Sequence, residues 1–272
     1  MKNSPKLSIV SNGQLSDPAA QSYAIEVEGF SAYYGKNCIL SDVNLKILKQ
    51  GVTCLVGPSG AGKSTLLRWL NRINEETEHA SFSGNIKVLD KDSMTGYPDV
   101  TELRRRVGMV FQQPCVFPCS IYDNMMMGLR AQKLSKTDAR DIIEKALKSA
   151  CLWDEVSHRL DGPAAALSLG QQQRLCLART LVLQPDVLLL DEPTASIDPV
   201  SSRVIEDLVM SLGRKIAVIM VTHNIAQAKR ISDQVVFLCD GKVVEQGPRE
   251  QIFSMRSSEK TRLYITEEFC DC

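Results

Sequence analysis

The chain has 272 residues, 44% of them hydrophobic and 24% charged, and its 32 basic and 32 acidic side chains give a net charge of zero. These values are typical of a globular protein with one large domain, or with a main domain and an inserted lobe. The balanced charge argues against a nucleic-acid partner. No stretch approaches the roughly 18 uninterrupted apolar residues of a membrane span.

Two further features narrow the class of protein. Residues 1–21 are polar and lack the apolar core of a signal peptide, so we expect a flexible leader. The nine cysteines are scattered and show no zinc-binding spacing. We interpret them as reduced thiols and expect no metal site built from cysteine.

Two half-buried strands are expected near the start of the chain. Residues 24–30 and 43–48 alternate apolar and polar side chains, as in an antiparallel sheet with one buried face. Tyr34 lies between them, just before a glycine. Its ring could stack on a purine, but a tyrosine on a sheet face is the simpler interpretation because strands are rich in tyrosine.

A glycine-rich loop then connects a predicted strand to a predicted helix. Residues 52–56 are apolar, and residues 66–70 have helical periodicity. The intervening pattern G-x-x-x-x-G-K-S is typical of a phosphate-binding loop, in which backbone N–H groups surround a phosphate. Lys63 would reach the outer phosphates and the Ser64 hydroxyl would bind Mg²⁺. The predicted loop residues are Gly57, Pro58, Ser59, Gly60, Ala61, Gly62, Lys63, Ser64 and Thr65.

The next segment continues the α/β pattern. We expect a loop over 71–83, a strand over 84–89, a helix over 99–106 and a buried strand over 107–111. The three arginines of 104–106 are most simply a solvated face, with partner docking as the alternative. Gln112 follows the buried strand, at the carboxyl edge where open α/β sheets bind ligands.

The character changes to helical between residues 114 and 185. Helical patterns cover 120–131, 136–150 and 168–183, so we predict an α-helical lobe inserted into the α/β domain. Met125 to Met127 are either core residues or a surface for a partner helix. Ser168 and Gln171 have capping-box spacing, typical of an ordinary helix start but also of an end that can bind a phosphate.

Acidic residues follow the most apolar strand of the chain. Residues 187–190 are all apolar and lead to Asp191, which could hold Mg²⁺, and to Glu192, which could polarise a water. The strand over 216–221 leads to His223 at the same sheet edge, where a γ-phosphate contact and a structural role are equally open. Asp198 is expected to cap the next helix.

The last segment contains strands over 235–239 and 242–245 and a short helix after Pro248. We expect residues 255–272 to be a mobile tail.

Taken in order, these signals resemble the ATP-binding subunits of ABC transporters, from about residue 23 to residue 265. The segments 104–114, 117–124, 171–176 and 247–253 are similar, more narrowly, to ATPase subunits of bacterial phosphate importers. The resemblance is carried by Tyr34, the loop 57–65, Gln112, the signature-like 167–171, Asp191, Glu192, Asp198 and His223.

The resemblance implies an α/β fold of the P-loop NTPase class. Its core would be a mostly parallel sheet with helices on both faces, joined to an antiparallel β subdomain and an inserted helical lobe. The implied boundaries are a leader over 1–21, an ATP-binding domain over 22–265 with the lobe at 114–185, and a tail over 266–272.

The resemblance also implies residue roles in a head-to-tail homodimer that holds two ATP molecules. Tyr34 would stack on adenine, and Gln112 would contact Mg²⁺ and the attacking water. Glu192 would be the general base, and His223 would contact the γ-phosphate. Ser168, Gly170 and Gln171 would complete the partner's site, with Asp198 joining the two sites.

The function implied is ATP hydrolysis that powers the import of inorganic phosphate. Two integral-membrane permeases would dock on residues 117–127, with an extracytoplasmic phosphate-binding protein acting indirectly, at the cytoplasmic face of the inner membrane. The alternatives are an importer for another solute, such as tungstate or a polar amino acid, and a soluble ABC ATPase. Neither long coiled coils nor a second ATPase domain, which would support several soluble roles, is present in the sequence.

Leu169 departs from the family signature, which has two adjacent glycines after the serine. If the backbone required a positive φ there, or if the partner's nucleotide came close, a leucine would cost about 1–3 kcal/mol or block the contact. We therefore expect slower hydrolysis or weaker ATP-induced dimerisation than in relatives.

Overall fold

The computed structural model describes residues 22–130, 132, 134–254 and 257–266. The predicted leader over 1–21 lies outside the described residues, as do residues 267–272 of the predicted tail. The strands are β1 (Tyr23–Tyr34), β2 (Asn37–Leu48), β3 (Gly51–Val56), β4 (Ala80–Val88), β5 (Lys91–Asp92), β6 (Val107–Val110), β7 (Val187–Asp191), β8 (Ala217–Val221), β9 (Gln234–Cys239) and β10 (Lys242–Pro248). The α-helices are α1 (Lys63–Trp69), α2 (Val100–Arg106), α3 (Ile121–Met126), α4 (Lys136–Ser149), α5 (Trp153–Val156), α6 (Leu169–Leu181), α7 (Pro199–Gly213), α8 (Ile225–Ile231), α9 (Arg249–Ile252) and α10 (Glu259–Ile265).

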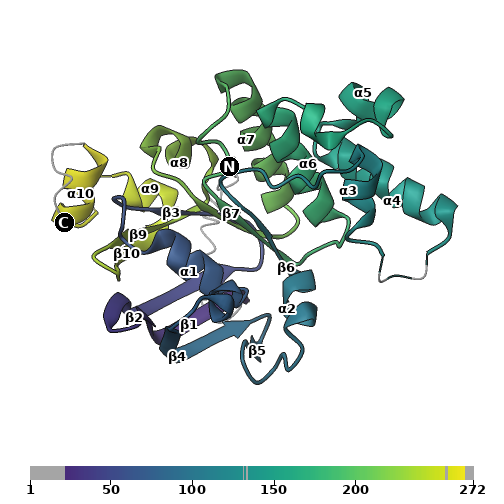
Figure 1. The fold of residues 1–272 in the computed structure, drawn as a ribbon. Coiled ribbons are helices and arrows are strands. Elements are labelled where there is room, and N and C mark those ends of the chain that lie inside the picture. The colour runs from purple at the N-terminus through teal and green to yellow at the C-terminus, as the bar shows by residue number, and fades with distance from the viewer. Residues whose placement is uncertain (1–21, 131, 133, 255–256, 267–272) are drawn as a thin grey trace, which may run out of the picture.

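The strands form two sheets (Figure 1). The larger sheet has the order β10-β9-β3-β8-β7-β6, and its strands are parallel except for the antiparallel pair of β9 and β10. The smaller sheet, β2-β1-β4-β5, is antiparallel throughout. The fold is therefore the expected α/β core with an antiparallel β subdomain.

Each face of the larger sheet packs on a different layer. On β7 and β8, Leu189 and Ile219 belong to a hydrophobic cluster shared with α1 and the antiparallel sheet. The alternate residues Leu188 and Val218 belong to a second cluster, shared with the helices on the other face. Because side chains alternate along a strand, covering both faces requires strands that are apolar at every position, as β7 and β8 are before Asp191.

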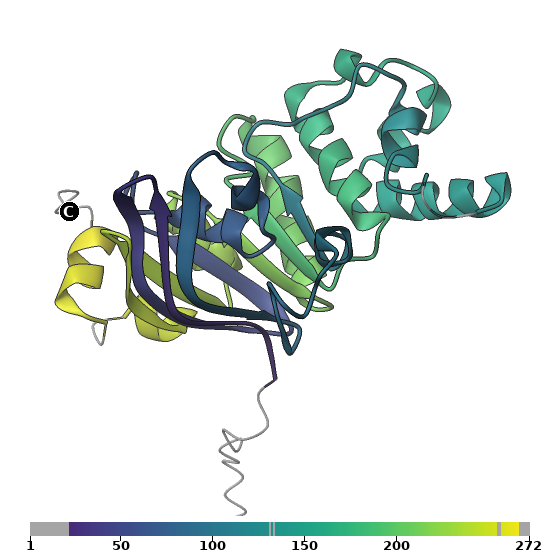
Figure 2. The same ribbon diagram turned by 60° about the horizontal axis from the view of Figure 1, so that its bottom comes forward.

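The helices α3 to α6 form the group predicted as an inserted lobe, and Figure 2 shows its teal helices set to one side of the sheets. The buried residues of α4 include Ala139, Ile143 and Leu147, spaced four apart on one helix face. They share a single hydrophobic cluster with residues of the parallel sheet such as Leu188. The helical group therefore packs as an extension of the sheet's own core.

The prediction of a helix over 120–131 is wrong about where the helix ends. Helix α3 stops at Met126, and Leu129, three residues further on, is buried. A Cβ on Gly128 would lie 2.9 Å from Val182 Cγ2, so close packing on the end of α6 takes over from the helical pattern. Met125 is fully buried and belongs to the core, whereas Met126 and Met127 are half-buried.

Two expectations about the end of the chain need correction. The described part of the predicted mobile tail contains α10, whose Tyr264 ring stacks on Phe237 of β9 at a centroid distance of 4.9 Å. Packing against the sheet therefore orders a segment that is too short to show a clear helical pattern in the sequence.

The cysteines at 38, 54, 115, 119, 151 and 176 are free thiols as expected, but Cys239 is disulfide-bonded, which corrects the expectation that all nine are reduced.

Among the described residues, no helix combines the length and the apolar character needed to cross a membrane.

Candidate active site

The loop of residues 57–62 joins the end of β3 to the start of α1. Gly57, Gly60 and Gly62 have φ angles of 150°, 82° and 94°, in a region that residues with side chains rarely adopt. A Cβ on Gly57 would lie 1.9 Å from the carbonyl oxygen of Leu238, so the loop packs directly on β9. The N–H groups of Gly60, Gly62 and Lys63 have no acceptor among the described residues, which leaves them available to an anion.

The side chain of Lys63 turns back into this loop. Its Nζ donates hydrogen bonds of 2.7 Å to the carbonyl oxygens of Gly57 and Pro58. Burial lowers the pKa of Lys63 from its ordinary value of 10.5, while Glu192 and Asp191 act in the opposite direction. A buried ammonium held only by neutral carbonyls would bind phosphate oxygens more strongly, because these carry negative charge. The loop residues therefore fit a polyphosphate.

Ser64 and Asp191 bring two oxygen atoms together beside the loop. Ser64 Oγ donates a hydrogen bond of 2.6 Å to Asp191 Oδ1, and Asp191 is 3% exposed. Arg68, one turn after Ser64 on α1, places its terminal nitrogen 3.4 Å from Asp191 Oδ2. A hydroxyl and a carboxylate are oxygen ligands of the kind that Mg²⁺ takes, so this pair fits the cation.

Glu192 is the centre of a second group of contacts. Its Oε2 lies 3.0 Å from Nδ1 of His223 and accepts a hydrogen bond of 3.4 Å from Nε2 of Gln112. An ionised carboxylate only accepts hydrogen bonds, so Nδ1 of His223 carries the proton of this contact and Nε2 remains for another partner. The Glu192 side chain is 19% exposed, which shelters the carboxylate but leaves it open to water.

The backbone of Glu192 is strained. Its φ of 46° is in the left-handed region, which costs a residue with a Cβ about 1 kcal/mol or more. Its N–H donates to the carbonyl of Val221 over 3.1 Å, and its own carbonyl accepts from Ala195 over 3.2 Å. These bonds hold a conformation that ends β7 abruptly beside the end of β8.

The strand order explains why residues far apart in sequence meet here. The strands β3, β8, β7 and β6 are successive parallel neighbours, so their carboxyl ends lie along one edge of the sheet. The loop follows β3, His223 follows β8, Glu192 follows β7 and Gln112 follows β6. The predicted meeting of Gln112, Glu192 and His223 at one edge is therefore confirmed.

Tyr34 lies at the end of β1 and is half-buried. Its hydroxyl donates a hydrogen bond of 3.0 Å to Asn74 Oδ1, and Asn74 Nδ2 donates one of 2.9 Å to the carbonyl of Thr65. Asn74 thus ties the tyrosine to the helix that follows the phosphate loop. Stacking on adenine stays a prediction.

The capping box at the start of α6 is confirmed. Ser168 Oγ accepts from the Gln171 N–H over 3.3 Å, and Gln171 Oε1 accepts from the Ser168 N–H over 2.9 Å. Gln171 Nε2 also donates to Glu155 over 2.7 Å. The oxygen and the nitrogen of the Gln171 side-chain amide therefore both have hydrogen-bond partners within the chain.

Gly170 and Asp198 meet where α6 starts beside α7. A Cβ on Gly170 would lie 2.5 Å from Ser201 Oγ and 3.8 Å from Asp198 Oδ2. Asp198 caps α7, as expected, and the hydrogen bonds that it accepts from Ser201 hold its pKa below the ordinary value. In the described part of the chain, no hydrogen bond or ion pair joins this signature group (Ser168, Gly170, Gln171 and Asp198) to the phosphate loop.

Comparison with known proteins decides the family. The profile of the ABC transporter family matches residues 40–195. The chain belongs to the ABC transporter family of ATPases. Family membership implies nucleotide binding and ATP hydrolysis, the chemistry that the phosphate loop and the acidic pair fit.

Individual ABC proteins extend the match to nearly the whole chain. The phosphate import ATP-binding protein PstB 2 of Aliivibrio fischeri is 45% identical over 267 residues, which are 98% of each chain. The structure of cbiO1 from Clostridium perfringens, part of the ABC transporter complex cbiONQ, has a TM-score of 0.76, 30% identity, and coverage of 91% of this chain and 99% of that one. A bacterial Atm1-family ABC exporter with ATP bound has a TM-score of 0.76 at 24% identity, covering 92% of this chain and 42% of that chain, and is similar in fold.

The unusual signature residue of this ABC ATPase causes no backbone strain. Leu169 is the first residue of α6, and it is absent from the residues with positive φ in the described part of the chain. The backbone cost of a leucine at a position with positive φ therefore does not arise. Its side chain is 43% exposed, so only a steric effect on a neighbouring molecule remains.

The structure adds several residues to the site that sequence patterns did not single out. Arg68 pairs with Asp191, and its position one turn after Ser64 is the signal that could have found it. Asn74 links Tyr34 to the loop helix. Gln227 contacts the threonines that flank the His223 and Glu192 segments, and no local pattern marks that role.

Two of the three arginines at 104–106 form ion pairs within the chain. Arg104 pairs with Glu76 and Arg106 with Asp186, over 2.5 Å and 2.8 Å. Arg105 is exposed. Docking to a partner through this segment would depend chiefly on Arg105.

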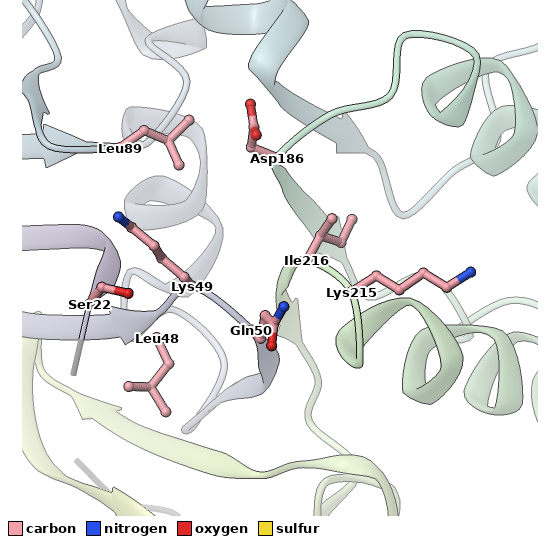
Figure 3. A pocket seen from close by; sticks show the side chains of 8 residues that line it. All are labelled: Ser22, Leu48, Lys49, Gln50, Leu89, Asp186, Lys215 and Ile216. Carbon is pink, nitrogen blue, oxygen red and sulfur yellow. The ribbon is translucent and has the colours of Figure 1, made fainter. Parts of the chain in front are cut away.

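A pocket of about 620 Å³ opens at the opposite edge of the parallel sheet (Figure 3). Its lining includes Gln50, Asp186 and Ile216, which immediately precede β3, β7 and β8. Lys49 on its wall pairs with Asp90, so this charge is balanced within the chain. The pocket lies at the amino ends of the strands, away from the phosphate loop and the acidic pair, and we assign it no part in nucleotide chemistry.

Proposed function

We propose that this ABC ATPase is the ATP-hydrolysing subunit of an importer of inorganic phosphate. The hydrolytic part rests on one observation, the contact of Glu192 Oε2 with both His223 and Gln112 at the sheet edge that carries the phosphate loop. The choice of substrate is supported by the 45% identity, over 98% of each chain, with a phosphate import ATP-binding protein.

The residues of the loop would bind and orient the nucleotide. Bound Mg²⁺-ATP supplies the terminal phosphoryl group that is transferred to water. Lys63 would exchange its two carbonyl partners for phosphate oxygens, and the free N–H groups of the loop would donate to the same anion. Ser64 and Asp191 would hold the cation between them.

Glu192 would act as the general base. Its carboxylate is partly exposed and can accept a proton from a water that approaches the sheet edge. His223 contacts one carboxylate oxygen through Nδ1, and its Nε2 would contact the terminal phosphate as a hydrogen-bond donor, which requires a proton on both ring nitrogens. The amide of Gln112, at the end of β6, would orient the water and reach the cation.

A complete site would require a second copy of the chain. Within one chain the signature group has no bonded contact with the phosphate loop, so a head-to-tail homodimer would place Ser168 and Gly170 of one copy over the loop of the other. Gln171 would support this edge through the capping box, and Asp198 would lie where the two sites meet.

The helical group would carry the contact with the membrane subunits. Phe117 is 38% exposed and Met127 is half-buried, in the segment assigned to two integral-membrane permeases. The chain would be peripheral, on the cytoplasmic face of the inner membrane. An extracytoplasmic phosphate-binding protein would contact the permeases, and nothing in this chain would contact nucleic acid.

Two measurements test the two parts of the proposal. The purified chain should hydrolyse ATP with Mg²⁺, and Glu192→Gln should retain ATP binding while losing at least about 100-fold in rate. Expressed with its permeases in cells that lack their own phosphate-import ATPase, the wild-type chain should restore uptake of labelled phosphate but not of tungstate. An active ATPase that restores tungstate uptake instead would refute the phosphate assignment alone.

A further inference from the structure

We propose that Gln227 is a positioning residue for hydrolysis, because its side chain ties the segment that carries His223 to the segment that carries Glu192. The inference rests on the proposed ATPase function. Gln227 lies on α8, is 3% exposed, and among the described residues forms no hydrogen bond with the phosphate loop or with the side chains of Glu192, His223 and Gln112.

A single amide bridges the two segments. Gln227 Oε1 accepts a hydrogen bond of 2.8 Å from Thr222 Oγ1, the residue before His223. Gln227 Nε2 lies 3.0 Å from Thr194 Oγ1, two residues after Glu192. His223 Nδ1 and Glu192 Oε2 are themselves 3.0 Å apart. The Gln227 bridge therefore joins the same two segments a second time, and it would fix the distance between these two side chains.

A buried carboxylate fixes the direction of this bridge. Gln227 Nε2 also donates a hydrogen bond of 3.0 Å to Glu206 Oε1, and the Glu206 side chain is 6% exposed. Arg230 donates to both Glu206 oxygens, over 2.8 Å and 3.1 Å. An ionised carboxylate only accepts, so the nitrogen of the Gln227 amide must face Glu206 and its oxygen must face Thr222. If the amide group of Gln227 were rotated by half a turn, its oxygen would face the oxygen of Glu206, and two hydrogen-bond acceptors would be in contact.

The bridge holds His223 from both sides along the chain. The Thr222 hydroxyl, which donates to Gln227, accepts from the Asn224 N–H over 3.0 Å. Asn224 Oδ1 in turn accepts from the Gln227 N–H over 2.9 Å. The His223 side chain is 61% exposed and its one hydrogen-bond partner in the described part of the chain is Glu192, so the place of the ring depends on that contact and on where the backbone of residues 222–224 is held. A displacement of about 1 Å is enough to lower a rate strongly.

The first test compares two Thr–Gln contacts, the buried one of Gln227 and the part-buried one of Gln234. Gln227→Leu keeps most of the side-chain volume but removes the bridge, and we expect kcat to fall at least about tenfold with KM within about twofold. The matched control is Gln234→Leu, which removes the hydrogen bond of 3.2 Å from Thr53 Oγ1 between β9 and β3, away from the site. The control should keep kcat within about twofold of the wild type.

A second pair of variants tests the same bridge from its other end. Thr222→Val removes the hydroxyl with little change in shape, whereas Thr222→Ser retains it. We expect Thr222→Val to lower kcat about as much as Gln227→Leu, Thr222→Ser to lower it less than about threefold, and the double variant Gln227→Leu/Thr222→Val to be no worse than either single one. This pair decides the matter should Gln227→Leu fail to fold.

A measurement without ATP separates this inference from the proposed function. The chain has 3 histidines, so the ring signals of His223 can be assigned by NMR with the His223→Gln variant. They should shift in Gln227→Leu and stay in place in Gln234→Leu. A wild-type chain that does not hydrolyse ATP would refute the proposed function, and the NMR result would still decide whether Gln227 positions the His223 ring. The inference is overturned by unchanged His223 signals in a folded Gln227→Leu, by a kcat within twofold of wild type, or by equal losses in the Gln234 control.

Discussion

Ser64 Oγ donates a hydrogen bond of 2.6 Å to Asp191 Oδ1, although the two residues are 127 positions apart in the chain. One follows the strand β3 and the other ends the strand β7, and β8 lies between these strands in the sheet. The pair places a hydroxyl and a carboxylate beside the phosphate loop, where a divalent cation bound to phosphate would lie.

Removing one oxygen of this pair should weaken the response to Mg²⁺. We expect Ser64→Ala to raise the Mg²⁺ concentration for half-maximal ATPase activity by about tenfold. Ser31→Ala is the control, because Ser31 Oγ accepts a hydrogen bond from the backbone N–H of Asp42 on the antiparallel sheet, away from the loop. An unchanged Mg²⁺ dependence in Ser64→Ala would rule out the metal role of this pair.

Replacing Lys63 by methionine should weaken nucleotide binding without destabilising the chain. Burial lowers the pKa of Lys63 in the folded state, so its charge opposes folding fully at every pH below that lowered pKa, and the penalty shrinks as the pH rises from there towards the ordinary value of 10.5. At pH 7 we expect ATP affinity, measured by calorimetry, to fall more than about tenfold. The Tm should equal or exceed that of the wild type. Retained affinity would contradict the assignment of the loop.

Leu169→Gly should increase ATP hydrolysis. The backbone of Leu169 is unstrained, so the gain would come from removing an exposed side chain beside Gly170 at the proposed interface. We expect a rate increase of several-fold at saturating ATP, together with a stability loss of about 1 kcal/mol from glycine in the first helical turn. Leu169→Ala should fall between the two. An unchanged rate in both variants would show that the leucine does not hinder the partner.

The ion pair of Glu206 and Arg230 should make the free energy of unfolding depend on pH. Burial acts to raise the pKa of Glu206, but hydrogen bonds from Arg230 and Gln227 hold it below its ordinary value of 4.5. This contribution is therefore present above pH 4.5 and is lost as the pH falls through the lower folded value. Thermal unfolding should show that Glu206→Gln lowers the Tm at pH 7 and that the difference from wild type narrows in acid.

The control for that experiment is Glu144→Gln. Glu144 pairs with Lys148 on the surface of α4, where both side chains are more than one-third exposed, so its loss should change the Tm little at any pH. A Tm difference for Glu206→Gln that stays constant from neutral to acid pH would contradict the prediction.

Helix α10 should contribute to stability but not to catalysis. Tyr264 is 9% exposed and stacks on Phe237 of β9. We expect Tyr264→Ala to lower the free energy of unfolding by about 1–3 kcal/mol, and Tyr264→Phe, which keeps the ring, by much less. The KM for ATP should be the same in both. Equal stability of Tyr264→Ala and the wild type would show that the stack is not formed in solution.

Short local patterns predicted much of the site. The spacing of glycines around Lys63, the apolar run before Asp191 and the capping box of Ser168 each follow from rules that act within a few residues. The common sheet edge of Gln112, Glu192 and His223 also followed, because parallel strands align their carboxyl ends. Helix α10 could not be predicted in the same way, since a helix of seven residues depends on its packing with Phe237.

The sequence by itself therefore determined the class of fold, the phosphate loop and the acidic and amide residues that surround it, because these features are encoded in local spacing. Only the tertiary structure decided which side chains pair. The contacts of Glu192 with His223, of Asp191 with Arg68, and of Gln227 with Thr222 join separate strands and helices. Such contacts depend on strand order, on register and on the strained turn at Glu192, and these follow from the packing of the whole core.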